Sequence, residues 1–202
     1  ISARRNAFYI ADQMQSDDWI IDVGLRWEEI DGTITREGSQ TVVVNDDPAL
    51  YEDLQLNVTG NGTLTHGNVD NSELAFSIAA LYKLTDNVNV YANYSRGFFF
   101  PELRGVAFNP NGQPGSYESE VVKQAEIGTK FFLDDFIGTV ALFKTDLEDR
   151  RSVDFVNDEN GVAVEVPVFQ STEAYGVEIV GSYNITDDLI FDANFTYTDH
   201  EF

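Results

Sequence analysis

The sequence predicts an all-β protein: a segment of about eight strands from a larger antiparallel, up-and-down transmembrane β-barrel. Three observations lead to this prediction. Runs of about ten residues rich in Val, Ile, Phe, Tyr and Thr alternate between apolar and polar side chains. Short acidic turns join these runs into pairs, and long polar connections separate the pairs. Aromatic residues gather near both ends of the runs.

The alternation is clearest in residues 19–28. One face of this run holds Trp19, Ile21, Val23, Leu25 and Trp27, and the other holds Asp22, Gly24, Arg26 and Glu28. A period of two fits such runs better than a helical period does. The same pattern predicts strands at 6–15, 19–30, 73–84, 88–98, 121–133, 136–147, 171–185 and 189–199.

The predicted strands form hairpins that alternate with long connections. We expect hairpins at 6–30, 73–98, 121–147 and 171–199, and long outer loops at 31–72, 99–120 and 148–170, the last with a turn at Asn160 and Gly161. Connections in compact soluble domains are mostly about 4–6 residues long. Short turns on one side and long loops on the other are typical of outer-membrane barrels, and about ten tilted residues span their apolar band of ~25 Å.

Aromatic residues near the strand ends predict two belts at the membrane–water boundaries, because amphipathic rings favour that depth. The run from Arg96 to Phe100 is predicted to mark the outer boundary, with Pro101 ending the strand. The alternative is that these rings cap the core of a soluble sheet. The predicted girdle consists of Trp19, Trp27, Tyr82, Tyr94, Phe131, Phe136, Tyr183 and Tyr197.

Polar and charged side chains on the opposite faces of the same strands are candidates for the barrel lumen. They would be either solvated lining or direct ligand contacts. These lumen-facing candidates are Asp22, Arg26, Glu28, Asn93, Glu126, Lys130, Glu178 and Asp192.

The charge of the chain excludes some functions. Its formal net charge of −23 makes nucleic acid an unfavourable partner. More than half of this charge lies in the long connections, either as plain loop solvation or as a vestibule that attracts cations. The chain has no cysteine, its acidic pairs suit turns better than acid–base catalysis, and no calcium-loop or phosphate-loop pattern is complete. We therefore predict no catalytic residue, cofactor or metal site.

The chain also looks like part of a longer protein. It begins without Met and without the apolar core of a signal peptide. Pairing of the predicted strands would place both ends on the side of the long loops, which is a natural place for an arbitrary cut.

Several segments resemble one family. "NVYANYSRGFFFPELRG" resembles the strand and exit segment of TonB-dependent outer-membrane receptors, and Gly24-Leu25-Arg26-Trp27 resembles the end of a hairpin in that family. Glu126, Gly128 and Lys130 match its Glu-x-Gly-x-Lys strand, and Gly176-Val177-Glu178 matches a later one. The chain departs from the pattern at Phe99-Phe100, where the family often has Arg-Ala, which puts ligand contacts there in doubt.

The resemblance implies a fragment of the C-terminal barrel domain, from a barrel of about 22 strands, without the plug domain. It implies a protein of the outer membrane of a Gram-negative bacterium, in contact with membrane lipid and lipopolysaccharide and coupled to the TonB complex through the missing plug. The implied function is uptake of a scarce ligand, foremost a ferric siderophore, with cobalamin or oligosaccharide as further possibilities. Two alternatives stay open: a passive porin or small structural barrel, and a secreted soluble β-sheet protein that acts on carbohydrate.

Overall fold

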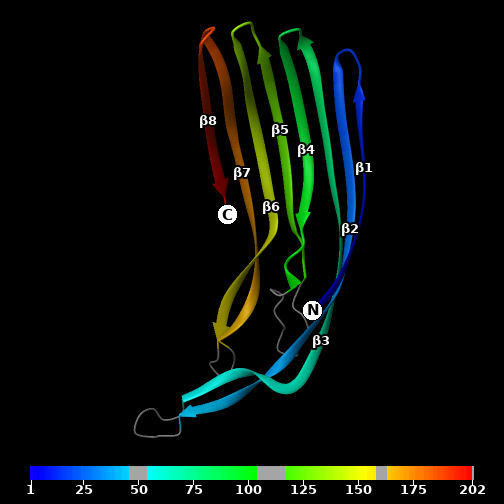
Figure 1. Ribbon diagram of the computed structural model, residues 1–202, viewed down its shortest axis with the longest axis vertical. Helices are drawn as coiled ribbons and strands as arrows, with labels where there is room; N and C mark the ends of the chain where they lie inside the picture. Colours follow the sequence, from blue (N-terminus) through cyan, green and yellow to red (C-terminus); the bar gives the residue numbers. More distant parts are fainter. Residues whose placement is uncertain (46–53, 104–116, 158–162, 202) are drawn as a thin grey trace.

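The computed structural model describes residues 1–45, 54–103, 117–157 and 163–201, which form one eight-stranded antiparallel sheet (Figure 1). Each strand pairs with its neighbours in sequence, and β1 and β8 form the two open edges. This all-β, up-and-down order confirms the predicted fold class, with the sheet not closed. The strands are β1 Ser2–Gln15, β2 Trp19–Asn45, β3 Leu54–Thr85, β4 Val88–Phe99, β5 Glu120–Phe132, β6 Phe136–Asn157, β7 Ala163–Thr186 and β8 Leu189–Glu201.

No helix suited to crossing a membrane, in length and apolarity, occurs in the described part of the chain.

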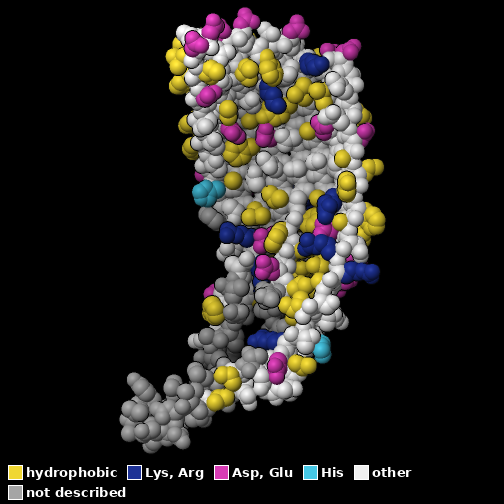
Figure 2. Space-filling view, in the orientation of Figure 1, with side chains coloured by type: hydrophobic (Ala, Val, Ile, Leu, Met, Phe, Trp, Pro, Cys, Tyr) yellow, Lys and Arg dark blue, Asp and Glu magenta, His cyan; other side chains and the backbone are white. Residues whose placement is uncertain are grey.

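The four short turns lie together at one end of the sheet, at the top of Figure 1. Short polar side chains close them: the Trp19 amide donates to Ser16 Oγ at 3.2 Å, and the Asn87 amide donates to Thr85 Oγ1 at 3.2 Å. Acidic side chains stand along this end (Figure 2). The turns are therefore built by the local bonds that such residues favour, as the sequence predicts.

The strand register gives the sheet two chemically different faces. Phe8 pairs with Trp27, Val23 with Ile78, and Ile127 with Leu142, all on what we call the apolar face. Residues that pair directly across neighbouring strands share a face, so this face continues from β1 to β8. The opposite face, which we call the polar face, carries Glu28 and Glu126.

The sheet is a single layer, and its apolar face is uncovered. Phe8 is 71% exposed, Ile127 60% and Phe195 56%, and no large side chain among the described residues is fully buried. A soluble domain would cover such a face with a second layer of structure. The uncovered face therefore requires another apolar environment.

Two strand pairs extend differently from the prediction. β2 and β3 continue as a paired ribbon far into the predicted loop 31–72, and β6 and β7 pair through Asn157 and Ala163 inside the predicted loop 148–170. Hydrogen bonding across the hairpin holds these segments as strands although their sequence alternates poorly. A register shift between Glu37 and Ser39 interrupts the β2–β3 ribbon. Residues 46–53 and 158–162, which include the predicted turn at Asn160 and Gly161, lie outside the described residues.

The β4–β5 connection behaves as predicted where the structure describes it. β4 ends at Phe99 and Pro101 follows, which has no backbone N–H to continue a ladder. β3 and β4 pair only as far as Phe76 and Arg96, so the end of β4 separates from β3. The described ends of the connection, residues 100–103 and 117–119, lie on the polar face of β1–β3, where most of the buried residues of the sheet lie.

Candidate functional site

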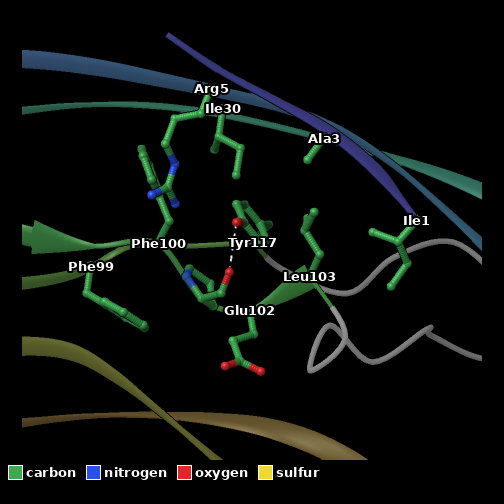
Figure 3. A pocket seen from close by; sticks show the side chains of 10 residues that line it. Ile1, Ala3, Arg5, Ile30, Phe99, Phe100, Glu102, Leu103 and Tyr117 are labelled. Atoms are coloured by element: carbon green, nitrogen blue, oxygen red, sulfur yellow. Dashed lines mark hydrogen bonds between the residues drawn. The ribbon is translucent and has the colours of Figure 1, made fainter. Parts of the chain in front are cut away.

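A hollow of about 770 Å³ lies where this connection meets the polar face of β1 and β2, at the end of the sheet away from the short turns (Figure 3). Its walls come from three parts of the chain: the start of β1, one residue of β2, and the two described ends of the β4–β5 connection. The lining residues are Ile1, Ala3, Arg5, Ile30, Phe99, Phe100, Pro101, Glu102, Leu103 and Tyr117.

Apolar packing fixes the connection against the sheet. Leu103 and Tyr117 pack against Ile34 and Val69, each 5% exposed. Gly32 makes this approach possible, since a Cβ at that position would lie 3.1 Å from Val69 Cγ2 and 3.3 Å from Leu103 Cδ2. The small residue in β2 thus allows Leu103 to approach the sheet closely.

Hydrogen bonds join the two described ends of the connection to each other and to β3. The Tyr117 hydroxyl donates to the Pro101 carbonyl at 2.8 Å, and Asn71 Nδ2 donates to Ser119 Oγ at 2.9 Å and to the Tyr117 carbonyl at 3.2 Å. Burial raises the pKa of the Tyr117 hydroxyl, so it stays a donor at neutral pH. These bonds hold the aromatic wall of the hollow in place.

A buried carboxylate organises the charged side of the hollow. Glu28, whose side chain is 5% exposed, accepts from Arg5 Nε at 2.9 Å and from Arg26 Nε at 3.0 Å. The Arg5 guanidinium also lies over the Phe100 ring, 5.4 Å from its centroid (Figure 3). Glu28 therefore orients Arg5, and Arg5 links the sheet to the connection by a cation–π contact.

The hollow offers a fixed guanidinium beside aromatic walls. Arg5 can bind an anionic group, while Phe99, Phe100 and Tyr117 can contact flat or apolar parts of a ligand. Its volume lies within the ~300–1,000 Å³ of small-molecule sites. Within the residues that the structure describes, no group of three or more His, Cys, Asp or Glu side chains is placed to hold a metal ion.

The eight predicted lumen residues all share the polar face by register, but only two adjoin the hollow. Asp22 pairs with Gln13 and Ala79, Asn93 with Glu126, Lys130 with Asn89, Glu178 with Ala141 and Asp192 with Ser182. Arg26 and Glu28 reach the hollow through Arg5. The remaining six lie along the strands, away from the hollow's lining.

A second group of contacting side chains on the polar face surrounds Tyr91. Its hydroxyl donates to Glu126 Oε1 at 2.5 Å, and Lys130 Nζ lies 5.1 Å from its ring centroid. The ring covers Gly128, where a Cβ would come within 2.6 Å of Tyr91 Cζ. Tyr91, which shares the polar face, thus contacts two of the predicted lumen residues, Glu126 and Lys130.

The eight predicted girdle residues all stand on the apolar face. Trp19 and Tyr82 have ring centroids 4.7 Å apart close to the short turns, and Phe76 and Tyr94 have centroids 5.7 Å apart farther along the strands. Phe136 and Tyr183 pair directly across β6 and β7. The register thus places the aromatic rings on one surface, at both ends of the apolar rows.

The aromatic exit of β4 places its rings in different surroundings. Arg96 to Phe100 were expected to mark the outer boundary; Phe98 is in register with Val121, and its ring centroid lies 5.0 Å from that of Phe100. Phe100, however, is 5% exposed and folds onto the polar face against Arg5. Because β4 ends at Phe99, strand parity no longer determines where the next ring points.

Sequence reasoning missed Arg5, Phe100 and Tyr117 as site residues. The cluster of three phenylalanines was the available signal for Phe100. Arg5 and Tyr117 carry no local signal, because their partners lie in β2 and across the connection.

Comparisons with known proteins agree with this architecture. The family model described as "TonB dependent receptor-like, beta-barrel" matches residues 1–202. A curated relative, an uncharacterized TonB-dependent receptor of Haemophilus influenzae, is 25% identical over 183 residues, which cover 91% of this chain and 45% of the relative.

Solved structures share the fold at low identity. The copper transporter OprC matches with a TM-score of 0.70 and 12% identity, over 98% of this chain and 30% of that one. The ferric yersiniabactin uptake receptor FyuA from Yersinia pestis matches with a TM-score of 0.66 and 17% identity, over 98% of this chain and 27% of that one. The chain thus spans less than half of the curated relative and about a third of these receptors.

Proposed function

Because the chain belongs to the TonB-dependent receptor family as part of its β-barrel, we propose that the full protein imports a scarce ligand across the outer membrane of a Gram-negative bacterium. TonB-dependent receptors are transporters and not enzymes. The energy for uptake would come from the TonB complex, acting through a plug domain elsewhere in the full protein.

The apolar face is the side that we propose contacts membrane lipid. Its exposed rows, from Phe8 in β1 to Phe195 in β8, have the composition of a hydrocarbon-facing surface. Trp19, Tyr82, Phe131, Phe136 and Tyr183 would form the belt near the short turns, and Trp27, Tyr94 and Tyr197 the outer belt, next to lipopolysaccharide.

The polar face is the side that we propose lines the lumen. Asp22, Asn93, Glu126, Lys130, Glu178 and Asp192 would contact water or the plug there. Arg26 and Glu28 would instead support the outer hollow through Arg5, because Glu28 joins both arginines.

The ligand that we propose is a ferric siderophore, captured at the outer hollow. The observation that carries this proposal is Arg5, held by Glu28 against Phe100 within a wall of aromatic rings. Ferric siderophore complexes commonly combine negative charge with flat chelating groups, and a fixed guanidinium beside rings suits both. The ferric yersiniabactin receptor among the structural neighbours gives a precedent within the fold.

Uptake measurements test the proposed transport. A strain that lacks the full-length gene should lose uptake of a radiolabelled ferric siderophore, and a plasmid copy should restore it only when TonB is present. Restored uptake without TonB, rising linearly with concentration for unrelated small solutes, would instead indicate a passive pore.

Replacing Arg5 by glutamine in the full-length receptor should weaken siderophore binding about ten-fold, because one charge-assisted contact is worth ~1.5 kcal/mol or more. Binding is measured on purified receptor by quenching of intrinsic fluorescence. Arg4→Gln is the matched control, since Arg4 lies next to Arg5 in β1 but on the opposite face. Equal affinities for the two variants would place the ligand away from the hollow.

A further inference from the structure

Asp12 is a charged residue on the apolar face, in the middle of its rows. It pairs with Val23 of β2, between the pairs Ile10–Leu25 and Met14–Ile21. Phe8 and Trp27 stand at one end of these rows, and Trp19 at the other. Within β1 and β2, no other charged residue lies on the apolar face between these aromatic positions.

Such a position is unfavourable for an isolated carboxylate. If the apolar face lies in lipid, Asp12 is near the middle of the hydrocarbon, where an ionised group without a partner loses its hydration. An acidic residue at the lipid face of a barrel costs less than a basic one, but it still opposes folding. The negative charge of Asp12 therefore requires a nearby group that compensates it.

Other charges on the same side of the sheet already have such groups. Lys123 forms an ion pair with Glu148 at 2.6 Å, and Lys144 forms one with Glu173 at 3.0 Å. Each partner carboxylate stands on a neighbouring strand. A carboxylate on a neighbouring strand thus pairs with each of these two lysines.

Asp12 lies on β1, whose second edge has no neighbour in this sheet. β2 offers only apolar residues around it: Ile21, Val23 and Leu25. Unpaired backbone groups cannot remain at an edge inside a membrane, so in the full barrel another strand must pair with this edge. The solved receptors that share the fold are about three times longer than the region that this chain covers, which leaves ample chain for that strand.

We propose that the barrel strand that pairs with the free edge of β1 carries a lysine or arginine opposite Asp12 on the lipid-facing side. The two side chains form an ion pair within the hydrocarbon band and fix the register of this strand junction. This inference rests on the proposed lipid contact of the apolar face.

The test uses the full-length receptor refolded into phospholipid vesicles, with the folded-to-unfolded ratio measured in urea. Asp12→Leu should lower the ratio at least ten-fold, because it leaves a cation unpaired in lipid. If Asp12 has no partner, Asp12→Leu should instead leave the ratio unchanged or raise it, and the proposal is overturned.

A second variant keeps the test informative if Asp12→Leu does not fold. Disulfide cross-linking from Asp12→Cys to cysteines placed along the neighbouring strand identifies the opposite residue. Replacing that residue by leucine together with Asp12→Leu should restore the ratio to within about two-fold of wild type. A double variant as defective as Asp12→Leu alone, or a non-basic residue opposite Asp12, contradicts the ion pair.

A control variant on β5 distinguishes a failure of the proposed ion pair from a failure of the proposed lipid contact. Ile127 stands on the apolar face between Ala92 and Leu142, with no basic residue directly across from it. Ile127→Asp should lower the folded-to-unfolded ratio if that face is in lipid. No effect of Ile127→Asp would overturn the lipid placement and the ion pair together, whereas a defect there with a stabilising Asp12→Leu would overturn the ion pair alone.

Discussion

Replacing Glu28 by alanine is expected to destabilise the full-length barrel by about 3 kcal/mol. The Glu28 side chain is 5% exposed and accepts hydrogen bonds from Arg5 and Arg26. Without it, two guanidinium groups lie close together with no carboxylate between them, and Arg5 loses the bond that aims it at Phe100. Ligand binding at the hollow should therefore weaken together with stability. Urea unfolding in vesicles measures the first effect, and fluorescence quenching by the ligand measures the second.

Two further variants make the Glu28 result specific. Glu28→Gln keeps the size and an acceptor oxygen, so its loss should be smaller than that of Glu28→Ala. Glu29→Ala changes the adjacent residue on the opposite face, and its effect should stay below about 0.5 kcal/mol. If Glu28→Ala and Glu29→Ala have the same stability, the buried carboxylate does not organise the site.

Replacing Gly176 by alanine should cost about 3 kcal/mol of stability, because the added methyl has no room. A Cβ at this position in β7 would collide with the backbone carbonyl of Tyr197 in β8 and would lie 2.6 Å from Phe143 Cζ in β6. The carbonyl belongs to the strand ladder and cannot move without disturbing it. Unfolding in urea and the yield of heat-modifiable barrel measure the effect.

Gly24→Ala is the matched control for Gly176→Ala. Its Cβ would lie 3.0 Å from the Ser77 hydroxyl, which can rotate away, so the cost should remain near 1 kcal/mol. Adding Phe143→Leu to Gly176→Ala should recover only part of the loss, since the contact with the Tyr197 carbonyl remains. Equal costs for the two alanine variants would show that β7 and β8 are not packed as described.

The sequence by itself determined the sheet. Alternation with a period of two places Trp19 and Ile21 on one face and Asp22 on the other, and the register keeps this division from β1 to β8. The short turns were equally predictable, because Ser16 and Thr85 form bonds within a few residues of themselves. Both features are local or periodic, so a single sequence contains them.

The tertiary structure alone decided the length of the outer ribbons and the site. The β2–β3 ribbon persists where its alternation fails, because strand pairing between residues far apart in the chain, such as Arg36 and Thr65, holds it. The hollow depends on Arg5, Glu28, Phe100 and Tyr117, which come from three separate segments. After Phe99 no ladder fixes the direction of a side chain, so contacts such as the packing of Leu103 and Tyr117 against Ile34 and Val69 determine that the described ends of the connection lie on the polar face. Contacts between residues far apart in the chain have no periodic trace in the sequence, and for that reason the fold could be predicted whereas the site could not.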